Sequence, residues 1–98
     1  MIKHIAMFQF TNKVNDSNRK EVLTTLSNSI QNMSTHIPGL LKAEFAPACR
    51  HCTHDIVLYI EFETEECVDV FNVHPLHIAH REMAKEYVCN RAVIDYVV

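Results

Sequence analysis

The order of strand-like and helix-like segments constrains this chain more strongly than any other feature of its sequence. Apolar residues in strand-like patterns predict four strands, at residues 2–10, 40–46, 54–63 and 91–98. Apolar residues at helical spacing predict one helix between the first two strands and a second helical region between the last two. The order is therefore β-α-β-β-α-β, which is typical of an α+β, ferredoxin-like fold whose helical regions cover one face of an antiparallel sheet.

Capping residues predict where the helices begin and end. One of residues 16–18 can cap the first helix, with Glu21 as a candidate capping-box partner, and residues 38–39 (Pro-Gly) end that helix. Thr64 is expected to cap the second helical region. Pro75 cannot continue that helix but suits the first turn of another, so we expect a break there.

Length and composition limit the chain to one domain over residues 1–98. The chain is 48% hydrophobic and 21% charged, close to average globular usage, so it should fold. Its formal net charge of -3 argues against nucleic acid or an anionic membrane surface as a partner. No apolar run could span a bilayer, and the first residues lack the pattern of a secretory signal. We therefore expect a cytoplasmic protein with reduced cysteines.

The sheet face that the helices leave uncovered is predicted to be apolar. Strand alternation assigns it these residues: Ile5, Met7, Val57, Tyr59, Val93 and Val97. A patch of this size is unusual on a monomer, and the simplest cover is the same face of a second copy. The alternative is a monomer with a shallower patch. We expect a homodimer.

Histidines are the main candidates for chemistry, because imidazole titrates near neutral pH. The chain has seven histidines. His4 shares a strand face with apolar residues, and His77 follows Pro75 on the last helix, so the two rings could meet in one pocket as an acid/base pair. The alternatives are structural: His4 as a buried ring bonded to backbone, and His74 as a helix cap before proline.

The segment from Cys49 to His54 contains a C-x2-C pair and two histidines, which are zinc-ligand types. No second cluster completes a tetrahedral site, so a surface loop with two reduced thiols is the favoured interpretation and no metal is predicted. Gly39 is the only glycine, which excludes glycine-rich phosphate loops.

Several segments resemble the stress-responsive dimeric α/β-barrel family, often called the Dabb domain. They are Ile2–Phe10, Ile37–Gly39, Phe62–Glu63, Phe71–His77 and Val93–Tyr96, and the resemblance extends over essentially the whole chain. The family pairs two ferredoxin-like sheets into a dimeric α/β barrel, which is the arrangement that the apolar sheet face requires.

The resemblance also implies candidate site residues. A plant polyketide cyclase of this family closes a linear polyketide by an aldol reaction without a cofactor. Its two site histidines match His4 and His77, whereas its tyrosine falls on Phe71, which lacks the hydroxyl that could bind a substrate or enolate. The resemblance therefore supports the pocket and the histidines better than it supports that reaction.

Two functions are consistent with these observations. The first is a small-molecule pocket protein, acting as a cofactor-independent cyclase or isomerase on an apolar carbonyl compound, with His77 as base and His4 as donor to the oxyanion. Its predicted binding residues are Phe8, Leu58, Ile60, Phe71 and His74. The second is a non-catalytic stress-response protein with structural histidines. An open cavity beside His4 would favour the first and a filled core the second.

Overall fold

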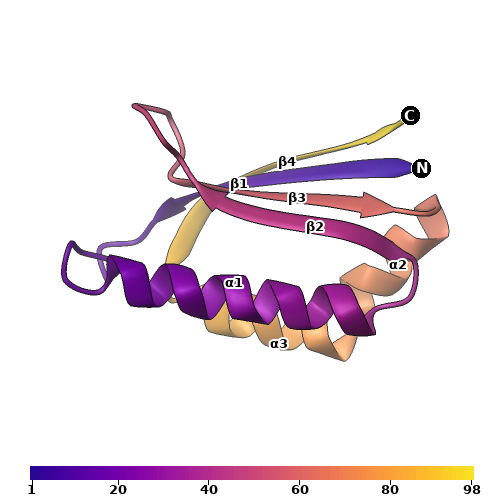
Figure 1. Cartoon of the computed structure of the whole chain (residues 1–98), viewed down its shortest axis with the longest axis horizontal. Coiled ribbons are helices and arrows are strands. Elements are labelled where there is room, and N and C mark those ends of the chain that lie inside the picture. The colour runs from indigo at the N-terminus through magenta and orange to yellow at the C-terminus, as the bar shows by residue number, and fades with distance from the viewer.

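A computed structural model describes all residues of the chain and shows one sheet with its helices on one side (Figure 1). The elements are β1 (Ile2–Phe10), α1 (Arg19–His36), β2 (Leu40–Pro47), β3 (Ile56–Phe62), α2 (Glu65–Val73), α3 (Pro75–Ala84) and β4 (Val88–Val97). The strand order is β2-β3-β1-β4, and every neighbouring pair is antiparallel. The predicted α+β, ferredoxin-like fold is confirmed.

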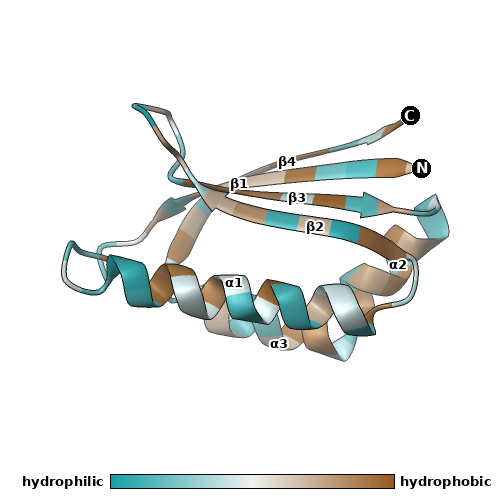
Figure 2. Cartoon of the chain, in the orientation of Figure 1, coloured by the Kyte–Doolittle hydropathy of each residue, from teal (hydrophilic) through white to brown (hydrophobic).

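The core lies between the sheet and the helices. Helix α1 turns one apolar stripe to the sheet: Val22, Leu26, Ile30 and Met33. Figure 2 shows these brown bands alternating with polar ones along α1. The largest fully buried side chains are Phe62, Phe71, Met33 and Ile60. Burying aliphatic and aromatic side chains of this size stabilises a fold by about 1.5–3 kcal/mol each, so this layer dominates the folding free energy.

The helix ends follow the sequence in part. The Thr64 hydroxyl accepts from the backbone N–H of Cys67 at 3.3 Å, as predicted. The capping box at α1 does not form, because the Asn18 side chain accepts instead from the backbone N–H of Asn15, at 2.8 Å. At the break before Pro75, the His74 Nδ1 accepts from the backbone N–H of Leu76 at 3.1 Å and caps α3.

Strand β4 begins at Val88, earlier than predicted, and contains an irregularity. Its register against β1 shifts between Met7 and Gln9, and Asn90 adopts a left-handed φ of 52°. This bulge adds a residue to β4 and reverses the side to which later side chains point.

The bulge corrects one prediction. Val93 pairs with Ala6 and Val97 with Ile2, so both valines lie on the helix side rather than on the uncovered face. Ile94 and Tyr96 take their place on the uncovered face. The periodicity of β4 could not show this, because both of its faces carry apolar residues.

The uncovered face is still largely apolar. Ile94 is 59% exposed, Tyr96 39% and Met7 38%. On the same face the Tyr59 hydroxyl donates to the Glu61 carboxylate at 2.5 Å, and this bond raises the pKa of Tyr59 to about 12. No helix of the chain has the length and apolarity needed to cross a membrane.

Candidate functional site

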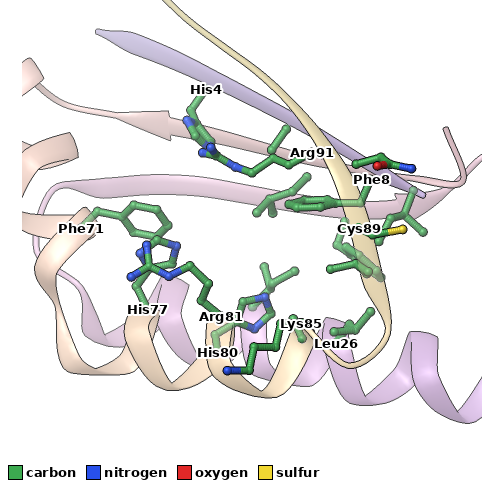
Figure 3. A pocket seen from close by; sticks show the side chains of 18 of the residues that line it. His4, Phe8, Leu26, Phe71, His77, His80, Arg81, Lys85, Cys89 and Arg91 are labelled. Carbon is green, nitrogen blue, oxygen red and sulfur yellow. The ribbon is translucent and has the colours of Figure 1, made fainter. Parts of the chain in front are cut away.

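A cavity of about 440 Å³ lies between the sheet and α3 (Figure 3). Most of its lining is apolar and comes from the sheet and all three helices: Ala6, Phe8, Leu26, Ile30, Phe45, Ile56, Leu58, Phe71, Ala84, Val88 and Cys89. Its polar lining includes His4, His77 and His80, and its basic lining residues are exposed, so the cavity reaches solvent. Apolar walls with a few polar groups are typical of small-molecule sites.

His4 lies on β1 and is 5% exposed. Its Nδ1 lies 2.5 Å from a carboxylate oxygen of Asp95, the residue directly opposite on β4. Because a carboxylate can only accept, Nδ1 carries the hydrogen, and in the neutral tautomer the lone pair lies on Nε2. The partner of His4 is thus a carboxylate rather than the backbone.

His77 lies on α3, and its ring stacks on Phe71 at 4.0 Å between centroids. Burial, reinforced by the positive charge of Arg81, lowers the pKa of His77 to about 4, although the backbone of Asn72 opposes the shift. The ring is therefore neutral at pH 7. Its Nδ1 is buried and has no hydrogen-bond partner, which is unusual in a folded protein.

The Phe71 ring contacts both His4 and His77. The ring packs edge-on against His4, with 6.2 Å between centroids, and Phe71 is 1% exposed. His4 and His77 line the same cavity (Figure 3), and the buried Phe71 ring packs against both. At the position of the cyclase tyrosine, the chain thus presents a ring that shapes the space between two imidazoles but offers no hydroxyl.

The other predicted binding residues divide into two groups. Phe8 and Leu58 line the cavity. Ile60 is fully buried in the core and His74 caps α3, and neither lines the cavity. Ile60 shares the helix-facing side of β3 with Leu58, but it lies in the core layer beside Phe62 and Phe71.

Several polar residues at the cavity are not predicted from the sequence. Asp95, which bonds to the cavity residue His4 without lining the cavity itself, could be found only from the register of β4 against β1. His80 bonds through Nδ1 to the Ser29 hydroxyl at 2.7 Å, and burial lowers its pKa. Arg81 is recognisable as the i+4 neighbour of His77 on a helix. Arg91 follows the bulge at Asn90, which no periodicity reveals.

The loop with the C-x2-C pair lies apart from these groups. Cys49 and Cys52 are exposed free thiols, and no three candidate ligands gather there or elsewhere in the chain. His54 bonds instead to the Asn90 carbonyl through Nε2, at 3.2 Å. This contact ties the loop to the bulge of β4.

Fold and site together define a ferredoxin-like protein with a histidine-bearing cavity under its sheet. The family model described as the Stress responsive A/B Barrel Domain matches residues 2–98, so the chain belongs to this family. No curated protein matches the chain by sequence.

Solved structures agree with this fold. A dimeric protein of unknown function from Bacteroides fragilis, with a ferredoxin-like fold, is 27% identical, with a TM-score of 0.86 over 97% of this chain and 93% of that one. A Dabb family protein from Mesorhizobium loti is 21% identical, with a TM-score of 0.77 over 99% and 95%. The hydroxynitrile lyase of Passiflora edulis is 10% identical, with a TM-score of 0.81 over 99% and 92%. The last two show the fold alone.

Proposed function

We propose that this chain forms a homodimer, and that each protomer binds a small, apolar, carbonyl-containing ligand in the cavity. The proposed activity is proton transfer next to the carbonyl without a cofactor, as in a cyclase or isomerase. The observation that carries the proposal is that His4 and His77 line one cavity that reaches solvent. A filled core at His4 would have favoured purely structural histidines.

The environments of the two rings favour roles opposite to those expected from the sequence. Asp95 holds His4 with its Nε2 lone pair free, which is the arrangement of a carboxylate-supported general base. His77, with a pKa of about 4, is a weak base, but a neutral imidazole can donate to a carbonyl oxygen. We therefore assign His4 as base and His77 as donor.

The chemistry then follows in two steps. His4 Nε2 takes a proton from the carbon beside the carbonyl, and the C–H electron pair moves into the enolate. The N–H of His77 binds the developing oxyanion, and apolar walls such as Phe8 and Leu58 exclude water. The enolate then either attacks a second carbonyl, which closes a ring and leaves an alkoxide that takes the proton from His4, or takes that proton back at another carbon.

The dimer is supported by the uncovered sheet face and by the Bacteroides fragilis neighbour, which is described as dimeric. Pairing these faces would bury the exposed Ile94 and Tyr96. It would leave the cavity accessible, because the cavity lies on the other side of the sheet (Figures 1 and 3).

Deuterium exchange at carbon tests the activity directly. Acetophenone in D₂O should lose its methyl proton signal faster with the protein than with buffer of matched imidazole content. Since general acid–base groups contribute about 10²–10⁴-fold, His4→Gln should abolish most of the acceleration. The exposed loop residue His51 provides the matched control, and His51→Gln should exchange at the wild-type rate.

Asp95→Asn separates the two assignments of the base. If His4 is the base, this variant should slow exchange markedly while acetophenone still binds. If only His77→Gln slows exchange and Asp95→Asn does not, His77 is the base. Binding without any acceleration over buffer would instead favour the non-catalytic alternative with structural histidines.

A further inference from the structure

We propose that the cavity recognises a carboxylate on its ligand, held at the mouth by Arg81 and Arg91. This inference rests on the proposed ligand-binding function and adds the chemical class of the ligand: an apolar body that carries both a carbonyl and a carboxylate. Three observations carry it: the cations gather at one opening, the two arginines among them form no ion pair, and no acid lines the cavity.

Two of the cations, Arg81 and Lys85, come from the same helix face as His77. His77, Arg81 and Lys85 follow one another at intervals of four residues along α3 and its C-cap, so one side of the helix presents all three to the cavity. His77 is partly buried, whereas Arg81 and Lys85 are exposed. The helix therefore places its imidazole inside the cavity and its positive charges at the rim.

The third cation comes from the opposite wall. Arg91 follows the bulge residue Asn90 on β4, and the bulge directs its side chain to the helix side of the sheet. Asn90 is held there by a side-chain bond to Gln9 at 2.5 Å. In Figure 3 the Arg91 side chain extends towards His4, and the Arg81 side chain extends towards His77. Two guanidinium groups thus approach the cavity from facing elements.

These arginines have no acidic partner within the chain. Neither Arg81 nor Arg91 forms an ion pair, whereas Lys85 pairs with Glu82 at 2.6 Å on the surface. No Asp or Glu lines the cavity. The whole chain carries a net charge of -3, so this local positive charge runs against the overall balance.

The shape of the guanidinium groups indicates which chemical group of the ligand they bind. A guanidinium group offers a planar fork that matches two carboxylate oxygens. The lining is otherwise largely apolar, which suits a hydrocarbon body rather than a nucleotide or a sugar. A carboxylate held between these two guanidinium groups would place the adjoining part of the ligand beside His4 and His77, where the proposed chemistry occurs.

The lowered pKa of His77 is consistent with this arrangement, since the charge of Arg81 contributes to the shift. A bound carboxylate would offset that charge. Ligand binding should therefore raise the pKa of His77.

A matched pair of probes tests the inference. Octanoate and octanamide have the same length and differ in charge at pH 7, and their affinities can be measured by calorimetry and by the NMR shifts of Phe8 and Leu58. We expect octanoate to bind at least about tenfold more tightly, since a charge-assisted hydrogen bond is of that order. The preference should shrink as salt is added.

Two variants test which side chains cause the preference for octanoate over octanamide. The double variant Arg81→Gln/Arg91→Gln should bind both probes equally and should fold, because neither arginine side chain makes a hydrogen bond or ion pair. Arg50→Gln removes one positive charge from the exposed Cys49–His54 loop, away from the cavity, and should keep the preference.

Equal binding of the two probes to the wild-type protein would overturn the carboxylate inference and leave the apolar pocket intact. Absence of binding by both would overturn the pocket itself.

Discussion

At the scale of single residues, the two cavity histidines differ in what satisfies their ring nitrogens. His4 is buried but has a carboxylate partner in Asp95, so its orientation is set by a bond across the sheet. His77 has an aromatic ring against one face and a buried Nδ1 without a partner. A buried polar atom left unpaired destabilises the free protein by about 1–3 kcal/mol, and a ligand that pairs with it recovers that free energy.

The protonation of His77 should make stability depend on pH. Its folded-state pKa of about 4 lies below the unfolded value of 6.5, so between these values only the unfolded chain binds the proton. The free energy of unfolding should fall as pH drops from 6.5 to 4 and then level off. We expect a loss of about 1 kcal/mol, less than a fully buried ring would give, because His77 is only partly buried.

Urea denaturation at several pH values checks this. His77→Gln should reduce the change in the free energy of unfolding between pH 6.5 and 4. His51→Gln, in the exposed loop, should leave that change as it is in the wild-type protein. His80, whose pKa burial also lowers, adds to the slope in the same direction. A titration of the His77 ring by NMR with its midpoint near 6.5 would contradict the prediction.

At the scale of elements, two left-handed residues set where elements turn. Asn90 forms the bulge that directs Arg91 to the cavity. Gly39 has a φ of 78° between α1 and β2, and its carbonyl accepts from the backbone N–H of Glu63 at 2.9 Å. Both positions join segments whose own periodicity ends there, so their backbone geometry decides how the next strand is placed.

Gly39→Ala should destabilise the fold by about 1–3 kcal/mol. The left-handed backbone strains any L side chain, and an added methyl group would overlap the Cys67 side chain, whose Cβ would be 2.8 Å away. The loss can be measured by thermal or urea denaturation. Cys67→Ala in the same chain should restore part of the loss by removing the sulfur but not the backbone strain. Wild-type stability of Gly39→Ala would show that the turn adopts another conformation.

At the scale of the whole molecule, the sheet separates two surfaces of different character, with all helices on one side (Figure 1). The helix side encloses the cavity, and the other side exposes apolar residues to solvent in the single chain. A dimer through the exposed side would cover the apolar face without blocking the cavity. Such an interface is expected to bury about 1,200–2,000 Å² in total.

Ile94→Lys should convert the dimer to a monomer, because a charge would be buried between two sheets. Ile94 is 59% exposed in the single chain and pairs with Ile5 on β1. Ile78 on α3, 41% exposed, provides the control on the other side, and Ile78→Lys should leave the dimer intact. Sedimentation equilibrium at micromolar concentration measures both. A wild-type protein that sediments as one chain would refute the dimer.

Much of the fold could be predicted from the sequence because periodicity is local. The spacing of Val22, Leu26 and Ile30 places one face of α1 inside, and Pro75 breaks the last helical region whatever it packs against. The two histidines were also recognisable, since His4 sits on a helix-facing strand position and His77 follows the break. These features depend on residues a few positions apart.

The register of β4 and everything that depends on it needed the tertiary structure. The bulge at Asn90 decides that Val93 faces the helices, that Asp95 meets His4 and that Arg91 reaches the cavity. The sequence by itself determined the order of elements and the apolar faces of α1, β1 and β3, because these arise from local spacing. Only the tertiary structure decided which polar groups converge, because that depends on pairing between strands at opposite ends of the chain.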